Sequence, residues 1–219
     1  MKLDKATLLS KRRNIFSENG EDGIFEYLFE IFNIKSGTFC EFGAWDGIHG
    51  SNTYNLLKNH KFSGVMIEAD KNKYRLLENL KSQHQNLEII NTYVDFEGQN
   101  KLDNILSKTK LPFSFDLLSI DIDGYDYYVW KSFTNYKPKF VIIEIDSDVK
   151  PGDYSIYSKK NNTPTGFSAV CELGIKKGYF PIFHSGNLLF ADINLLSKFD
   201  FKLNLDINHL YCDPKIFYY

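Results

Sequence analysis

Short apolar runs, each with one or two carboxylates at its end, are the feature that most constrains the fold. Five such runs lie at 38–43, 64–69, 87–94, 114–121 and 138–145. Their lengths suit buried β-strands, and stretches with helical periodicity separate them. The last run is almost continuously apolar, which indicates burial on both faces, as in a central strand of a parallel sheet. This alternation predicts a βαβ series and a doubly wound sheet.

Helices are expected between and before these strands. The stretches with helical spacing are 21–33, 52–57, 71–82, 102–106, 125–134 and 165–178. Two further runs, 179–184 and 187–191, flank Ser185-Gly186 and predict a β-hairpin. The expected fold class is therefore α/β, with a doubly wound, mostly parallel sheet and a C-terminal antiparallel hairpin.

The length of 219 residues suits a single domain over 1–219. Residues 1–35 are expected to be a helical lead-in to it. Residues 147–164 are rich in proline, glycine, asparagine and tyrosine, and a loop of this length is usually functional or disordered, so we interpret it as a substrate lid. The tail, 193–219, carries Phe217, Tyr218 and Tyr219, which would either dock on the core or contact a second subunit in a homodimer.

Charge and composition exclude some classes of partner. The net charge is -2, and the arginines are Arg12, Arg13 and Arg75, which does not favour nucleic acid as a partner. No apolar run approaches the ~20 residues that would span a membrane.

Cysteine usage and the amino terminus favour a cytoplasmic protein. Cys40, Cys171 and Cys212 are far apart and show no metal-binding spacing, which is typical of reduced core cysteines. The first residues, Met1 to Lys5, are charged and lack the apolar segment of a signal peptide.

The first strand leads into an acid-and-glycine turn and then a helix. Strand, glycine turn and helix is the arrangement that binds nucleotide-sized ligands at the carboxyl edge of a parallel sheet. Gly43 and Gly47 would let the backbone bend sharply and approach such a ligand.

Acids follow all five strands, at positions that a parallel sheet brings to one edge. They are Glu41, Glu68, Asp95, Asp121 with Asp123, and Glu144 with Asp146. Favourable contacts with helix dipoles would explain one or two of them, but not a set after five successive strands.

Three of these acids suggest the type of ligand. Glu68 is placed to accept both hydroxyls of a ribose. Glu41 would repel a pyrophosphate and suits an amine-bearing ligand, which favours S-adenosylmethionine over a dinucleotide. Asp95 would accept from the adenine amino group or from a nearby backbone amide.

With these residues in view, the chain resembles class I S-adenosylmethionine-dependent methyltransferases of the FkbM-like type, from about residue 15 to 192. The segments that carry the resemblance are Ser17-Glu18-Asn19-Gly20-Glu21-Asp22-Gly23, Cys40-Glu41-Phe42-Gly43-Ala44-Trp45-Asp46-Gly47, Gly64-Val65-Met66-Ile67-Glu68, Ser119-Ile120-Asp121-Ile122-Asp123-Gly124-Tyr125-Asp126 and Val141-Ile142-Ile143-Glu144-Ile145. One departure is Trp45, which replaces the middle glycine of the fuller Gly-x-Gly-x-Gly form.

The resemblance implies O-methylation of a hydroxyl on a sugar, a nucleotide-activated sugar or a similar small polar precursor of a surface polysaccharide or natural product. The cofactor would be S-adenosylmethionine. The residues expected to bind it are Glu41, Gly43, Asp46, Gly47, Asn52, Glu68, Ala69, Asp95, Phe96 and Asp121.

Catalysis would fall to Asp121, Asp123 or His184, with Glu144 as a further candidate. Asp121, Asp123 and Glu144 could also hold an octahedral Mg²⁺ or Mn²⁺ that lowers the pKa of the acceptor hydroxyl. Against this, Asp121 could serve the methionine end of the cofactor. For His184, the alternative to a general base is a solvent-facing residue of the hairpin.

Two rival functions stay open at this stage. One is a Rossmann-like protein that binds a cofactor without turnover. The other is a nicotinamide-dependent oxidoreductase, against which the acidic first turn argues.

Overall fold

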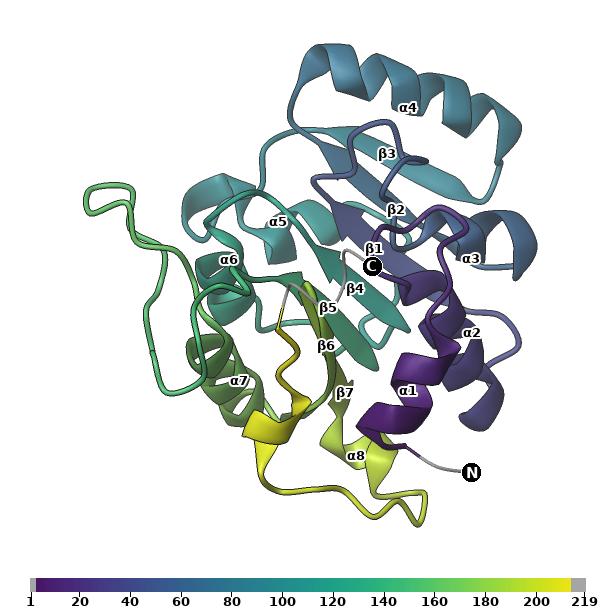
Figure 1. The fold of residues 1–219 in the computed structure, drawn as a ribbon. Helices are drawn as coiled ribbons and strands as arrows, with labels where there is room; N and C mark the ends of the chain where they lie inside the picture. Colours follow the sequence, from purple (N-terminus) through teal and green to yellow (C-terminus); the bar gives the residue numbers. More distant parts are fainter. Residues whose placement is uncertain (1–2, 214–219) are drawn as a thin grey trace.

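A seven-stranded sheet forms the centre of the protein, whose computed structural model describes residues 3–213. The parallel strands are β1 (Thr38–Phe42), β2 (Ser63–Glu68), β3 (Leu87–Asn91), β4 (Leu117–Ile120) and β5 (Phe140–Glu144). The hairpin strands are β6 (Tyr179–Ser185) and β7 (Asn187–Asp192). The strand order is β3-β2-β1-β4-β5-β7-β6, and β7 runs antiparallel to both of its neighbours (Figure 1). The predicted fold class is therefore confirmed.

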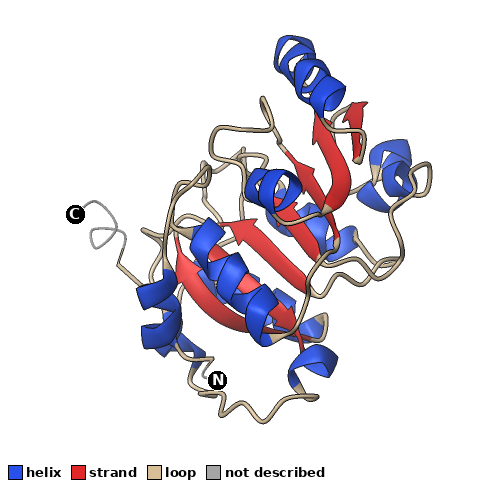
Figure 2. Ribbon diagram, turned by 90° about the vertical axis from the view of Figure 1, so that its right-hand side faces the viewer, coloured by secondary structure: helices blue, strands red, loops and turns tan. Residues whose placement is uncertain are grey.

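Helices cover both faces of this sheet. They are α1 (Lys5–Lys11), α2 (Glu21–Ile31), α3 (Tyr54–Asn59), α4 (Lys71–Gln83), α5 (Leu102–Leu106), α6 (Asp126–Ser132), α7 (Phe167–Lys176) and the short α8 (Ile193–Leu196). Figure 1 shows α1, α2 and α3 on one side and α5, α6 and α7 on the other. In Figure 2 the strands cross behind helices, as expected for a covered sheet.

Two hydrophobic cores result, one on each face, because side chains alternate along each strand. In β5, Phe140 and Ile142 pack into the core with α2, whereas Val141 and Ile143 pack into the core with α6 and α7. The almost continuously apolar run is thus explained by burial on both faces, as the sequence predicts.

Four strands are shorter than predicted: β1 ends at Phe42 rather than at 43, β5 spans Phe140–Glu144 rather than 138–145, and the differences in β3 and β4 follow from their pairing. β3 ends at Asn91 rather than at 94, because it is an edge strand whose one partner, β2, ends at Glu68 opposite Asn91. β4 begins at Leu117 rather than at 114, because Leu117 is its first residue to pair with β1, opposite Phe39. The residues freed after β3 become part of the loop that borders the site.

The Ser17–Gly23 segment of the resemblance joins the start of α2 to the hairpin. Asp22 accepts hydrogen bonds from three successive backbone amides, those of Ile15, Phe16 and Ser17. Glu21 accepts one from the side chain of Asn187, 2.9 Å away at the start of β7. This segment therefore fixes the amino end of α2 beside the hairpin turn.

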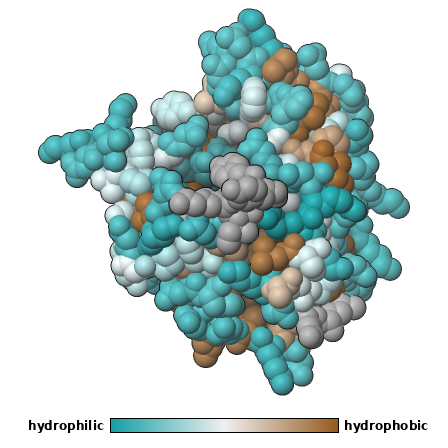
Figure 3. All heavy atoms as spheres, in the orientation of Figure 1, coloured by the Kyte–Doolittle hydropathy of each residue, from teal (hydrophilic) through white to brown (hydrophobic). Residues whose placement is uncertain are grey.

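The loop 147–164 is tied down near both of its ends. The amide of Asp146 donates to the carbonyl of Thr165 (2.9 Å), and that of Gly166 donates to Ser155 (3.0 Å). Between them, Ser158 and Thr163 form an isolated bridge. Figure 1 shows the loop (green) projecting beyond α6 and α7, and Figure 3 shows that this projection is hydrophilic.

Part of the C-terminal tail docks on the core. Tyr211 stacks on His184, with ring centroids 5.3 Å apart, and Leu210 and Cys212 are buried. Lys5 donates to the carbonyl of Tyr211 (2.8 Å), which joins the tail to α1. The aromatic residues Phe217, Tyr218 and Tyr219 lie outside the described residues.

Cys40, Cys171 and Cys212 are buried free thiols, as expected. Between residues 3 and 213, no helix combines the length and the apolar character needed to cross a membrane.

The ends of β1 and β4 meet at Gly43. This residue has φ 73°, and a Cβ atom there would lie 1.6 Å from the carbonyl oxygen of Asp121. Since no side chain fits, the close approach of the two strands is by itself enough to require glycine at position 43, in addition to the approach of a ligand that the sequence predicts.

We expect Gly43→Ala to lower the free energy of unfolding by at least about 3 kcal/mol, through backbone strain and steric overlap together. Gly98→Ala separates the two effects, because Gly98 has φ 67° but nothing within 4 Å of its added Cβ. Gly98→Ala should lower the free energy of unfolding, measured with urea, by only about 1 kcal/mol. Equal losses in the two variants would contradict this account.

Candidate functional site

A cavity of about 770 Å³ opens at the carboxyl ends of β1, β2 and β4 and at the loop after β3. Most residues predicted to bind a cofactor line it, namely Glu41, Gly43, Glu68, Ala69, Asp95, Phe96 and Asp121, together with Asp123. Asp46, Gly47 and Asn52 do not line it. The geometry therefore brings the strand-end acids together around one space, as the topology of a parallel sheet requires.

Glu68 lies on the wall of this cavity with its carboxylate already oriented. Its two oxygens accept from the backbone amides of Trp45 (2.8 Å) and Asp70 (2.7 Å). Each carboxylate oxygen has a second acceptor site. An oriented carboxylate of this kind can receive two hydroxyls, as the sequence argument requires.

Glu41 is buried beneath the cavity, and protein donors engage both of its oxygens. It accepts from the hydroxyls of Ser51 and Thr53, both at 2.7 Å, and from the amide of Asn52 at 2.9 Å. Burial raises the pKa of Glu41, and the hydroxyl donors oppose this rise. Glu41 thus ties β1 to the start of α3. Three protein donors occupy most of the acceptor capacity of Glu41. Glu41 is therefore less suited to select an amine-bearing ligand than the sequence predicts.

The turn after β1 keeps its shape through side chains that face away from the cavity. Asp46 accepts from the amides of Ile48 and His49, both at 2.9 Å. A Cβ on Gly47 would come within 2.6 Å of Leu77, so this glycine serves packing against α4. Asp46 and Gly47 therefore shape the turn and do not contact the cavity.

Trp45 departs from the glycine pattern in its side chain but not in its backbone. Its φ is 49°, in the left-handed region that glycine favours. The ring is half exposed on the cavity wall, and the ammonium of Lys73 lies 5.5 Å from its centroid. In the sequence, Trp45 only replaces a glycine of the expected pattern, and no signal there indicates that its ring lines the cavity.

An aromatic group borders the part of the cavity near Asp95. Phe96 packs against Tyr125 and Tyr128, with ring centroids 5.6 and 5.3 Å apart. Asp95 accepts from the amide of Phe96 (2.7 Å), which fixes the carboxylate beside these rings. This combination offers a flat apolar surface and a hydrogen-bond acceptor to one ligand.

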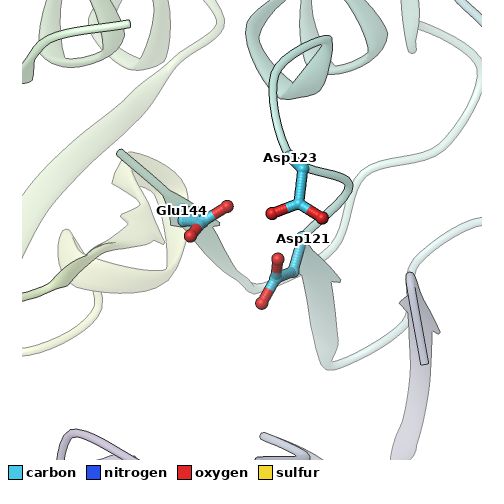
Figure 4. A group of neighbouring side chains, drawn as sticks. All are labelled: Asp121, Asp123 and Glu144. Carbon is cyan, nitrogen blue, oxygen red and sulfur yellow. The ribbon is translucent and has the colours of Figure 1, made fainter. Parts of the chain in front are cut away.

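Asp121, Asp123 and Glu144 form a group of carboxylates at the ends of β4 and β5. One oxygen from each lies within 4.8 Å of the others, and Figure 4 shows the three side chains around a shared space. Burial and the neighbouring charge of Glu144 raise the pKa of Asp121 to about 8. Burial and the charges of Asp126 and Asp123 raise the pKa of Glu144 to about 7. The side chain of Asp121 is exposed to the open cavity, whereas that of Glu144 is half-buried.

Asp126 holds the turn that carries two of these acids. Its carboxylate oxygens accept from the amides of Ile122 and Gly124, both at 2.8 Å. Asp123 lies between them with φ 55°, in the left-handed region that non-glycine residues rarely adopt. Asp126 also lies in the first turn of α6, and its positioning of Asp123 has no sequence signal beyond the Asp-Gly-x-Asp spacing of residues 123–126.

A second cavity, of about 570 Å³, lies on the other side of Asp123. Its walls come from Asp123, Gly124, Asp126, the end of β5 with Glu144, Ile145 and Asp146, and the loop residues Tyr157, Asn162, Thr163, Pro164 and Thr165. Asp123 lines both cavities, so they meet at this residue. The loop that the sequence assigns to a substrate lid thus supplies one wall of the second cavity.

His184 does not line either cavity. It is fully buried, so the expectation of a solvent-facing residue is wrong. Nδ1 accepts from the amide of Cys212 (3.0 Å), which leaves the proton on Nε2, 3.0 Å from the hydroxyl of Ser147. The geometry therefore gives the predicted catalytic role of His184 no support.

Solved structures with a similar fold include proteins described as methyltransferases. The chain is 16% identical to a proposed caffeoyl-CoA O-methyltransferase from Staphylococcus aureus, over 84% of this chain and 86% of that one, with a TM-score of 0.51. It is 12% identical to a proposed sarcosine dimethylglycine methyltransferase from Galdieria sulphuraria, over 74% of this chain, with a TM-score of 0.50. It is 10% identical to the CMeT domain of the citrinin polyketide synthase, over 78% of this chain, with a TM-score of 0.51.

The chain spans 62% of the Galdieria protein and 51% of the polyketide synthase domain. A comparison with protein-family models gave no match, and a search of curated proteins gave none. At these identities, the likeness shows the Rossmann-like fold, and the reaction is argued below from the site.

The buried His184 makes acid stability a test of this part of the structure. Burial, and then the charge of Lys5, lower the pKa of His184 to about 4. Since its ordinary pKa is about 6.5, the unfolded state binds more protons as pH falls from 6.5 toward 4, and stability is lost in that window.

When the pH falls from 7 to 5, proton uptake by this histidine in the unfolded state should lower the free energy of unfolding by about 2 kcal/mol. We expect the loss measured by urea unfolding to be smaller by about that amount in His184→Gln, which cannot take up the proton. The same pH dependence in both proteins would contradict a buried neutral imidazole.

Proposed function

We propose that the protein is an S-adenosylmethionine-dependent methyltransferase of the FkbM-like type. Its substrate would be a hydroxyl on a sugar, a nucleotide-activated sugar or a similar small polar precursor of a surface polysaccharide or natural product. The observation that carries the proposal is Glu68, whose carboxylate is oriented by two backbone amides at the end of β2 and faces a cavity of cofactor size. The buried free cysteines support a reducing, cytoplasmic location.

The strand order supports this reading over the rival oxidoreductase. Dinucleotide-binding sheets commonly have the order 3-2-1-4-5-6 in a parallel arrangement. Here β7 enters antiparallel between β5 and β6, which departs from that arrangement.

The residues present fit S-adenosylmethionine along the first cavity. Glu68 would accept the ribose hydroxyls, and Asp95 and the Phe96 ring would hold the adenine. Asp121, with the backbone beside Gly43, would face the methionine end. The bound cofactor would supply a methyl group to an acceptor hydroxyl held in line with it.

Asp121 and Glu144 are suited to take the proton of that hydroxyl. Their pKa values, raised to about 8 and about 7, lie near neutrality, where a carboxylate can exchange a proton during reaction. One oxygen of each of these carboxyl groups lies within 4.8 Å of the other, so one group can hold the proton while the other is charged.

Asp121, Asp123 and Glu144 also fit a divalent cation. Three hard oxygen donors lie within 4.8 Å, and opposite ligands of octahedral Mg²⁺ lie about 4 Å apart. Mg²⁺ or Mn²⁺ held there would lower the pKa of the acceptor hydroxyl.

We expect Glu68→Gln to weaken S-adenosylhomocysteine binding at least about tenfold in calorimetry, because a neutral amide leaves only one acceptor oxygen for the ribose. Glu97→Gln is the matched control, since Glu97 lines the same cavity but is exposed. Unchanged affinity in a folded Glu68→Gln protein would count heavily against the proposal.

The metal is tested by titrating Mn²⁺ and following its paramagnetic resonance signal, which needs no acceptor. Binding should be lost in Asp123→Asn and kept in Asp148→Asn, which changes an exposed acid of the neighbouring loop. If wild type and Asp123→Asn bind Mn²⁺ equally, the proposed cation site is wrong. Once the acceptor is known, full activity in EDTA would lead to the same conclusion.

A further inference from the structure

We propose that the second cavity is the acceptor site, and that it selects a neutral or amine-bearing polyhydroxylated ring over phosphorylated, carboxylated or nucleotide-activated forms. This inference rests on the proposed methyl transfer and narrows its substrate. The cavity meets the first one at Asp123, so a hydroxyl held in the second cavity lies at the junction where a transferred group would pass.

The walls of the second cavity carry negative charge only. Asp123, Asp126, Glu144 and Asp146 line it, and no lysine, arginine or histidine of residues 3–213 does. Asp126 is engaged by two backbone amides, and the amide of Asp148 donates to one oxygen of Asp146 (2.9 Å). Asp123, Glu144 and the second oxygen of Asp146 are left to face the cavity. A bound divalent cation would not reverse the sign, since Asp121 adds a fifth carboxylate at the junction. A phosphate or carboxylate on the ligand would be repelled here, whereas hydroxyls and ammonium groups can donate to these acids.

Tyr157 provides a fixed aromatic wall of this cavity. Its ring packs on Gly124, where an added Cβ would come within 2.8 Å of it, and against Tyr125, with ring centroids 5.1 Å apart. Its amide donates to the hydroxyl of Thr165 (2.9 Å), and Tyr128 donates to its carbonyl (3.2 Å). The ring is therefore held before any ligand binds, which suits stacking on the apolar face of a sugar.

The remaining wall offers neutral hydrogen-bonding groups. Asn162 and Thr163 come from the loop, and Thr165 precedes α7. An amide and two hydroxyls can each donate or accept, so they match ring hydroxyls without requiring charge. Acids, neutral donors and one aromatic face together describe a site for an uncharged or amine-bearing polyol.

The test uses a small-molecule extract of the cells in which the protein naturally occurs. The extract is separated on an anion exchanger. Each fraction is incubated with the full-length protein and S-adenosylmethionine labelled in its methyl group. We expect at least tenfold more label to enter compounds of the unretained fraction, which holds neutral and cationic molecules.

Label mainly in the retained, anionic fraction would overturn this inference and leave the methyltransferase proposal intact. Label in neither fraction, from a protein that binds S-adenosylmethionine, would contradict both. Absence of binding to S-adenosylmethionine would refute the proposed function itself.

Variants then tie the selectivity to this cavity. Tyr157→Leu should raise the KM for the labelled acceptor at least tenfold without changing the affinity for S-adenosylhomocysteine, and Tyr157→Phe, which restores the ring, should recover most of the loss. Asp146→Lys should lower the ratio of label in the unretained fraction to label in the retained fraction about tenfold. Unchanged KM in Tyr157→Leu, or unchanged preference in Asp146→Lys, would show that the acceptor binds elsewhere.

Discussion

The close contact between Gly43 and the carbonyl oxygen of Asp121 is the constraint on which the site depends. It lets β1 and β4 end side by side, with no side chain between them. The chain after β1 then turns back through Trp45, whose amide reaches Glu68 at the end of β2. One backbone approach thus sets the distance between Glu68, the proposed ribose-binding acid, and the acids that follow β4.

The acids at this edge differ in function because their hydrogen-bond partners differ. Glu41 is satisfied by protein donors, and Asp126 is used to shape a turn. Glu68 is oriented by amides but keeps acceptor sites toward the cavity. Burial, and then neighbouring negative charges, raise the pKa of Asp121 and of Glu144. The group that these two acids form with Asp123 therefore favours protons, hydroxyls or a cation in its midst.

Periodicity and strand-end acids were sufficient to predict the fold and the edge where the site lies. The βαβ alternation and the hairpin were predicted correctly, because strands that are buried on both faces are almost continuously apolar and stretches with helical periodicity separate them. The sequence could not tell which acids keep free acceptor sites. That distinction for Glu41 depends on Ser51 and Thr53, whose hydroxyls reach it only after the turn has folded.

His184 and Trp45 show the same limit. The tail residues Tyr211 and Cys212 cover His184, and nothing in the hairpin itself indicates that they return to it. Trp45 looks like a lost glycine, yet its backbone adopts the conformation that a glycine would take. The surroundings of both residues depend on contacts with residues far apart in the sequence.

A crystal structure of the protein with S-adenosylhomocysteine tests the central claim most directly. The account predicts both ribose hydroxyls on the Glu68 carboxylate, the adenine beside Asp95 and Phe96, and the sulfur directed toward Asp123, where the two cavities meet. A ligand bound in the first cavity with its ribose away from Glu68, or with its sulfur directed away from the second cavity, would contradict it.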